Sequence, residues 1–160
     1  MKTKITYHPI GIIRTPFKEL QGMPIQPSGA KGVKGQVEIE ADFAGGLQDI
    51  EGFSHIILLY HLHKAEGYSL LVVPFLDKRE RGLFATRAPR RPNPIGLSVV
   101  RLVKREGNVL HVEDVDILDG TPLLDIKPYV PTFDPPADRL GWLEELGRDA
   151  RRIRSDDRFA

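Results

Sequence analysis

The chain has 160 residues, of which 41% are hydrophobic and 28% charged, and its net charge is +1. These values fit one globular domain with a sizeable core, and they give no overall field that would attract nucleic acid or a membrane. Because the sequence has no cysteine, disulfides, thiolate metal sites and a cysteine nucleophile are excluded. The first residues lack the apolar run of a signal peptide, so we expect a cytoplasmic protein with no membrane span.

The first third of the chain predicts two short strands on either side of a long loop. Residues 7–14 are apolar and predict a first strand, and residues 35–39 alternate between polar and apolar as a half-buried strand does. Between them, residues 15–34 are rich in glycine and proline, and a loop of this length in a compact domain is functional or disordered. Residues 43–50 then predict a short helix or turn.

Residues 53–63 are the best candidate for a central strand because they contain a continuous apolar run of strand length. His55, His61 and His63 share one parity and should lie on one face of that strand. Two readings are open: ordinary hydrogen-bonded histidines, or ligands of a metal. No carboxylate-rich segment at a recognisable spacing accompanies them, so we expect no metal site.

The next part of the chain predicts a strand at 68–74 and then a stiff loop at 84–97. That loop contains three prolines, which fix the backbone and push the residues before them into extended geometry. Arg87, Arg90 and Arg91 place three permanent charges on it, each a planar fork suited to carboxylate or phosphate. The alternative is a rigid, solvated loop that carries a cluster of charges.

Three further strands are predicted in the second half of the chain. Residues 98–104 and 109–118 are rich in valine and are joined by a glycine-containing hairpin connection at 105–108. Residues 123–126 form another short strand. They belong to a second stretch, 118–129, that is as rich in turn residues and polar groups as the arginine-bearing loop.

The six to eight short strands predict an all-β fold, mainly an antiparallel β-barrel, with one or two short helices and a C-terminal helix. No glycine-rich fingerprint opens a helix, which disfavours a Rossmann-type nucleotide site. We expect residues 1–134 to form the barrel domain, and 135–160 to be a linker and helix of the same unit. The helix should begin at Asp138 and carry an apolar stripe. The stripe consists of Leu140, Leu143, Leu146, Ala150 and Ile153. Docking on the body, dimer formation and RNA binding are alternative roles for this helix.

Several separate motifs, in order along the chain, resemble the TsaA-like family. They are PIGIIRTPFKE at 9–19, QP at 26–27, GFSH at 52–55, GLFATR at 82–87, RPNPIG at 91–96 and DGTPLLDIKPY at 119–129. The resemblance covers about residues 7–134 and is to the short, archaeal-like form of the family. It implies an antiparallel β-barrel and a homodimer with the cofactor near the subunit interface. It also implies S-adenosylmethionine as cofactor and methylation of N6 of threonylcarbamoyl-adenosine in the anticodon loop of tRNA.

The same resemblance implies which residues bind the cofactor. Arg87 would hold the cofactor's carboxylate through a charge-assisted fork, and Leu97 would pack on an apolar part. The other implied positions are Gln26, Pro27 and Ser28 on one wall, His63 and Lys64 on another, and Asp116, Ile117, Leu118 and Asp119 at the adenine and ribose. For Asp119, a plain turn role ahead of a glycine is an equal alternative.

Methyl transfer to the weakly nucleophilic N6 would gain from a base and from a group that stabilises charge. Asp125 and Tyr129 are candidates for the base, and Arg91 and Asn93 for the second role. A structural ion pair between Asp125 and Lys127 is the alternative for Asp125.

Contact with the single-stranded anticodon loop needs a local basic patch. The candidates are Arg79, Arg81, Arg90 and Arg91. Two other functions stay open: a cofactor-binding protein that methylates another acceptor, and a non-catalytic sensor or regulator.

Overall fold

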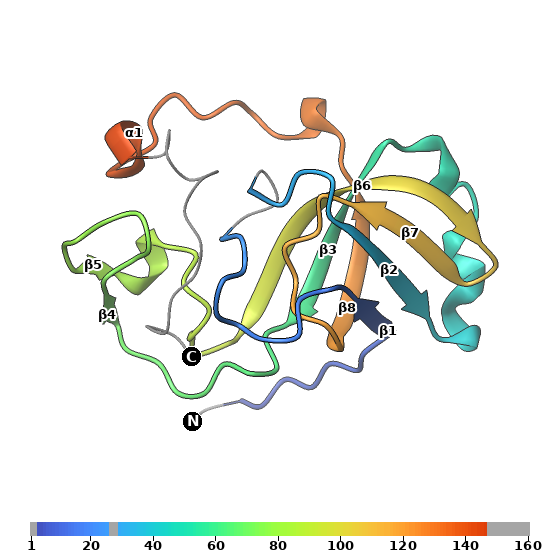
Figure 1. Cartoon of the computed structure of the whole chain (residues 1–160), viewed down its shortest axis with the longest axis horizontal. Helices are drawn as coiled ribbons and strands as arrows, with labels where there is room; N and C mark the ends of the chain where they lie inside the picture. Colours follow the sequence, from blue (N-terminus) through green and yellow to red (C-terminus); the bar gives the residue numbers. More distant parts are fainter. Residues whose placement is uncertain (1–2, 26–28, 147–160) are drawn as a thin grey trace.

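The computed structural model describes residues 3–25 and 29–146, and its main body is a closed antiparallel barrel of six strands (Figure 1). In spatial order the barrel strands are β1, β2, β7, β6, β3 and β8. Their bounds are Gly11–Arg14 for β1, Lys34–Ile39 for β2, His55–His61 for β3, Ile95–Glu106 for β6, Val109–Glu113 for β7 and Thr121–Pro128 for β8. The all-β prediction is therefore confirmed.

Strand β3 shows how an apolar run becomes a barrel wall. It pairs with β6 on one side and with β8 on the other, which confirms its central position. Ile56, Leu58 and Tyr60 are buried in the barrel, whereas the residues between them face outward and are only half-buried. His55 and His61 lie on this outer face, as their shared parity predicts, but β3 ends before His63.

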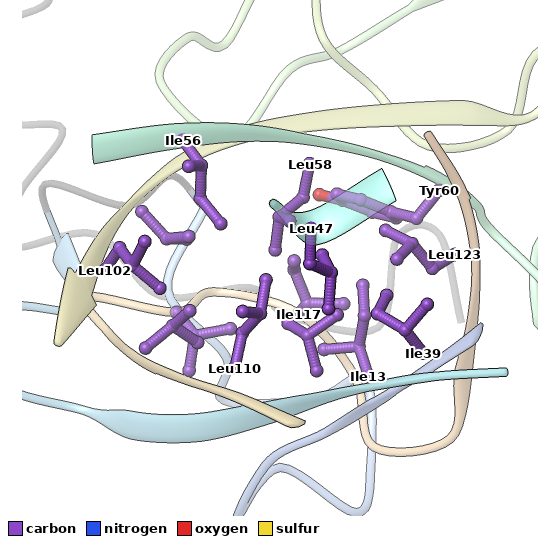
Figure 2. Close-up of a cluster of buried hydrophobic side chains, with 14 residues drawn as sticks. Ile13, Ile39, Leu47, Ile56, Leu58, Tyr60, Leu102, Leu110, Ile117 and Leu123 are labelled. Atoms are coloured by element: carbon purple, nitrogen blue, oxygen red, sulfur yellow. The ribbon is translucent and has the colours of Figure 1, made fainter. Parts of the chain in front are cut away.

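The core of the barrel is a single cluster of side chains contributed by every barrel strand (Figure 2). Two non-strand segments close its ends. Leu47 enters from the 3-10 helix η2 (Ala41–Leu47), which is followed by η3 (Ile50–Gly52). At the other end, Ile117 enters from the connection between β7 and β8. Strands β1, β3 and β7 end there and β6 begins there, so their connections lie close together. We call this second end of the barrel the site end, since the candidate site described below lies at it.

Two predicted strands are shorter in the structure. The first begins at Gly11 instead of residue 7, and Tyr7 is 68% exposed, since Pro9 cannot donate to a neighbouring strand. The strand predicted at 109–118 ends at Glu113, because Asp114 adopts a left-handed φ of 63° that breaks the ladder. Its carboxylate then accepts a hydrogen bond of 2.7 Å from the Gly32 N–H.

The strand predicted at 68–74 is wrong as a barrel strand. Only β4 (Leu71–Val72) forms, and it pairs with β5 (Arg81–Gly82) in a separate two-stranded sheet beside the barrel (Figure 1). A small second core supports this sheet, with Leu83 only 1% exposed at its centre. Leu83 begins the 3-10 helix η4 (Leu83–Ala85). We call residues 66–91 the β4–β5 unit.

The C-terminal helix differs from its prediction in the described residues. After the 3-10 turn η5 (Pro131–Phe133) the chain runs extended, and α1 covers only Leu143–Leu146 instead of starting at Asp138. Gly141 has a φ of 60°, which a right-handed helix cannot accommodate, so the helix starts after it. Ala150 and Ile153 lie outside the described residues, and no described helix is long and apolar enough to cross a membrane.

Candidate functional site

A chain of three hydrogen-bonded polar side chains enters the site end of the barrel: Tyr60 and Ser98 are buried and Asp116 is half-buried. The Tyr60 hydroxyl lies 2.8 Å from Ser98 Oγ, and Ser98 donates a hydrogen bond of 2.6 Å to Asp116 Oδ1. An ionised carboxylate only accepts, so Ser98 donates to Asp116 and Tyr60 donates to Ser98. The hydrogen bonds thus all point towards the Asp116 carboxylate.

A glycine makes room for this chain. Gly96 faces Tyr60 across the β3–β6 pair, and a Cβ at that position would lie 2.1 Å from the Tyr60 ring. Any other residue at Gly96 would displace the ring and, with it, the hydroxyl that bonds Ser98. The sequence alone held a signal for this arrangement, because Tyr60 and Ser98 occupy inward positions of otherwise apolar strands.

Burial controls the ionisation of both ends of the chain. It raises the pKa of Asp116 to about 6, and the Ser98 hydrogen bond and the positive charge of Arg87 only partly oppose this rise. Burial also raises the pKa of Tyr60 well above its usual range, helped by the nearby negative charge of Asp116. Tyr60 is therefore a neutral donor, and Asp116 is a carboxyl that titrates near neutral pH.

Arg87 is the cation that faces this buried chain. It is exposed to solvent in the loop between η4 and β6, and its charge favours the ionised forms of both Asp116 and Tyr60. The structure thereby brings together two of the predicted cofactor residues, Arg87 and Asp116, from segments about 30 residues apart in the sequence. An exposed guanidinium beside a half-buried carboxylate can bind a ligand that carries both charges.

Asp119 has a structural role in the chain. Its Oδ1 accepts a hydrogen bond of 3.0 Å from the Thr15 N–H, and its Oδ2 pairs with Lys18 Nζ at 2.8 Å. The hydrogen bond from Lys18 and that from Thr15 hold the pKa of Asp119 below its usual value. Both carboxylate oxygens thus tie the 15–18 segment to the site end, which favours the turn role that the sequence left open.

Ile117 and Leu118 can contact a ligand only through their backbone, since both side chains are buried in the described structure, at 2% and 8% exposure. Their carbonyl groups are already engaged: Ile117 accepts from Thr15 Oγ1 and Leu118 from Thr121 Oγ1, each at 2.6 Å. The backbone at this position is therefore rigid.

Three further predicted cofactor residues, His63, Lys64 and Leu97, follow or belong to strands at the same end. His63 follows β3, and burial, then the positive charge of Lys64, lowers its pKa. Leu97 lies on the outer face of β6 opposite Leu59 and is 48% exposed. Gln26, Pro27 and Ser28 lie outside the described residues.

Arg91 holds its own loop. Its Nη1 donates to the carbonyls of Leu83, Thr86 and Ala88 at 3.4, 3.0 and 3.2 Å. Its guanidinium also lies 5.8 Å from the centre of the Phe84 ring. The exposed Asn93 follows, and its carbonyl accepts from the Ile95 N–H at the start of β6.

Tyr129 lies away from this cluster within one chain, and Asp125 lies in the middle of β8, opposite Leu59. Asp125 pairs with Lys127 at 2.9 Å, which is the structural alternative expected from the sequence. Tyr129 packs edge-on against His55, with ring centroids 6.4 Å apart, at the start of β3. Six residues of strand separate His55 from the site end at His61, a span of about 20 Å. The four predicted catalytic residues are thus not brought together in a single chain.

Arg81, predicted as part of an RNA-binding patch, is engaged within the protein. Its Nε and Nη2 bind Asp77 Oδ2 at 2.7 and 2.6 Å, and its guanidinium lies 5.3 Å from the centre of the Trp142 ring. Trp142 Nε1 in turn donates to the Ala85 carbonyl at 2.9 Å. Sequence analysis missed this contact, because no periodicity links residue 142 to the η4 turn.

A closed six-stranded barrel with an arginine and a half-buried carboxyl at one end defines a small β-barrel domain with polar groups gathered at that end. The family model for the tRNA-methyltransferase O N-terminal domain matches residues 12–135, and the chain belongs to this family. The match supports an S-adenosylmethionine-dependent tRNA methyltransferase, with S-adenosylmethionine as its cofactor.

The relatives agree in sequence and in fold. A probable S-adenosyl-L-methionine-binding protein of Pyrococcus abyssi is 59% identical over 97% of this chain and 85% of its own length. A mouse tRNA (adenine(37)-N6)-methyltransferase is 38% identical over 80% of this chain and 31% of its own. The crystal structure of TrmO from Pseudomonas aeruginosa superposes with a TM-score of 0.73 and 41% identity, covering 88% of this chain. This chain spans 63% of that solved relative.

Proposed function

We propose that this chain transfers the methyl group of S-adenosylmethionine to N6 of threonylcarbamoyl-adenosine in the anticodon loop of tRNA. The observation that carries the proposal is the position of Arg87, whose charge acts on the Asp116 carboxyl, at the site end of a barrel of this family. The mouse relative, named as an adenine-37 N6-methyltransferase of tRNA, supports the choice of acceptor. Because the substrate is tRNA, we expect the protein to act in the cytoplasm.

The residues at the site end fit the cofactor's chemistry. Arg87 offers an exposed fork for the carboxylate of the amino-acid tail, and Asp116 offers a carboxylate for an ammonium or a ribose hydroxyl. Leu97 is a half-exposed apolar side chain, and His63 lies at the end of the neighbouring strand. When bound, the cofactor supplies a methyl group on a positively charged sulfur. The protein's contribution is to orient the acceptor nitrogen towards it.

The predicted catalytic residues divide into two groups in this proposal. Asn93 is exposed in the same loop as Arg87 and can contact the acceptor, while Arg91 acts mainly by holding the loop, since its Nη1 is taken by three carbonyls. Asp125 lies in the middle of β8 opposite Leu59 and pairs with Lys127, whereas Tyr129 follows the far end of β8, so it can reach this site only from a second copy of the chain. A homodimer with the cofactor near the subunit interface would allow this.

Mixing two inactive variants tests the role of a second copy. Arg87→Ala and Tyr129→Phe would each inactivate their own homodimer, whereas a mixture would contain dimers with one intact site. Recovery of up to about a quarter of wild-type activity on mixing is expected from random pairing. If the Tyr129→Phe variant is fully active, Tyr129 has no catalytic role.

A second candidate function is cofactor binding with transfer to another acceptor, or with no transfer at all. It is favoured by the Pyrococcus abyssi relative, whose name states only cofactor binding. The deciding experiment measures transfer from labelled S-adenosylmethionine to tRNA with and without the threonylcarbamoyl group. Transfer only to the modified tRNA supports the proposal, and cofactor binding without transfer to either tRNA supports the second candidate.

A further inference from the structure

Phe84 is a large aromatic side chain that the protein holds rigidly but leaves in solvent. It lies in the middle of η4 and is 75% exposed, while Leu83 beside it is only 1% exposed in the second core. The Leu83 N–H also donates to the Leu70 carbonyl at 2.9 Å, which fixes the turn to the β4–β5 sheet. The backbone under Phe84 is therefore anchored, so its ring has a defined position.

A cation, the guanidinium of Arg91, lies over one face of the Phe84 ring and is itself held by hydrogen bonds. The Arg91 guanidinium lies 5.8 Å from the ring centre, and its Nη1 binds three carbonyls of the same loop. A cation over one face of an aromatic ring attracts it electrostatically. Arg91 thus favours a fixed orientation of the ring.

A third contact fixes the turn from the C-terminal side. Trp142 Nε1 donates to the carbonyl of Ala85, the residue after Phe84, and the Trp142 ring lies under Arg81. Three separate segments therefore order the residues around Phe84, yet in the described structure none of them buries its ring. Such a pre-organised ring loses little entropy on binding a flat ligand.

The charges around Phe84 indicate what kind of ligand this is. Arg87, Arg90 and Arg91 follow within seven residues of chain and carry permanent positive charge. Single-stranded nucleic acid presents the matching combination, a flat base with phosphates on either side. Proteins bind it with aromatic side chains for the bases and cations for the backbone.

We propose that the Phe84 ring is a stacking platform for an unpaired base of the RNA substrate's loop. The inference rests on the proposed function, because it assumes that the acceptor is an RNA loop. It assigns recognition of the acceptor to the β4–β5 unit. Cofactor binding then belongs to Arg87 and the barrel.

Replacing Phe84 in the full chain tests this assignment. Phe84→Ala should weaken binding of a labelled anticodon stem–loop oligoribonucleotide by about 5- to 150-fold, the effect of losing one stacked base. Phe84→Tyr and Phe84→Trp should stay close to wild type, because both retain a stacking face. Phe133→Ala is the matched control, since Phe133 is equally exposed, at 77%, but lies in η5. Binding of a fully paired duplex of the same stem should not change in any variant.

Three results would overturn the inference. The first is a Phe84→Ala variant that binds the stem–loop as tightly as wild type. The second is a variant that loses S-adenosylmethionine affinity instead, which would assign the ring to the cofactor's adenine. The third is a Phe84→Ala variant in which only the oligomeric state, measured by sedimentation, changes. This would mean that the Phe84 ring contacts a second copy of the chain.

The outcome can be separated from that of the proposed function. Wild-type methyl transfer to tRNA together with an unaffected Phe84→Ala variant refutes only the platform. A wild-type protein that neither binds the stem–loop nor methylates tRNA refutes both. Phe84→Trp guards against misfolding, because it replaces the side chain while retaining the ring.

Discussion

In the barrel, the polar side chains at the site end are buried and bonded to one another, whereas in the β4–β5 unit an aromatic ring is held out into solvent. Tyr60 and Ser98 are 7% and 1% exposed, and Phe84 is 75% exposed. A buried hydrogen-bonded chain fixes a charge for a small ligand of defined shape. An exposed ring with a fixed orientation suits contact with a larger partner at the protein surface. The two regions meet at Arg87, which lies between η4 and β6.

The two cores provide the largest expected difference between these regions. Leu110 lies in the barrel core and Leu83 in the second core, at 0% and 1% exposure. Leu110→Ala should lower the free energy of unfolding of the whole chain by about 2–5 kcal/mol, the cost of a cavity in a packed core. Leu83→Ala should instead open residues 66–91 locally. Denaturation monitored by circular dichroism, together with hydrogen exchange, distinguishes the two effects.

The control for that pair is Leu70→Ala, because Leu70 is 60% exposed in the β4–β5 unit and its removal should change little. If Leu83→Ala lowers amide protection in β3 and β8 as much as Leu110→Ala does, the two cores unfold together. The division into a barrel and a separate unit would then be wrong in energetic terms.

The second expected effect concerns cofactor affinity. Arg87→Ala should weaken binding of S-adenosylmethionine by about 1.5–3 kcal/mol, the contribution of a hydrogen bond to a charged group. Arg87→Lys should recover only part of this, because an ammonium cannot form the two-pronged fork. Isothermal titration calorimetry measures both. Arg79→Ala, an exposed arginine of the same unit, is the matched control, and an equal loss there would indicate a general charge effect instead of a specific contact.

The third prediction concerns the pH dependence of stability. The pKa of Asp116 is about 6 in the folded protein, well above its value of 3.8 in an exposed carboxyl. Between these two values the folded state binds the extra proton, so stability falls as pH rises from about 4 to 6. The stability difference between wild type and Asp116→Asn should therefore change by on the order of 2 kcal/mol over this range.

The difference curve is needed because other carboxylates titrate in the opposite direction. Hydrogen bonds from Lys18 and Thr15 lower the pKa of Asp119, so its contribution to stability is present at neutral pH and is lost in acid. Subtracting the Asp116→Asn curve removes this contribution, since it is common to both proteins. A flat difference between pH 4 and 6 would contradict the raised pKa of Asp116.

Periodicity predicted the barrel because its walls follow local rules. The apolar run around Ile57 became β3, and the hairpin predicted at 105–108 forms, with its turn confined to Gly107 and Asn108. The predicted end of the strand at 109–118 and the predicted start of the C-terminal helix were both wrong, each because of a single residue. Asp114 takes a left-handed conformation, and Gly141 does the same before α1. Neither is visible in a hydrophobic pattern, because other backbone conformations are also open to both residues.

Sequence motifs indicated residues of the candidate site, but they did not predict how these residues are arranged in space. The sequence indicated Arg87 and Asp116, but their proximity depends on how the barrel closes. Tyr60 and Ser98 were read as parts of strands, since only the register between β3 and β6 brings their side chains together. Phe84 drew no attention either, because exposure depends on what the second core leaves outside.

The smallest expected effect tests how the β4–β5 unit keeps its ring in place. Trp142→Phe removes the Nε1 donor to the Ala85 carbonyl while retaining an aromatic ring under Arg81. The loss of one such hydrogen bond costs about 0.5–1.5 kcal/mol, so amides of residues 83–88 should exchange several-fold faster. Barrel amides should not change, because the hydrogen bond that is removed lies in the β4–β5 unit. If the exchange of residues 83–88 is unaltered, the contact from the C-terminal segment does not stabilise the turn. The rigidity of Phe84 would then come from the Leu83 core and Arg91 alone.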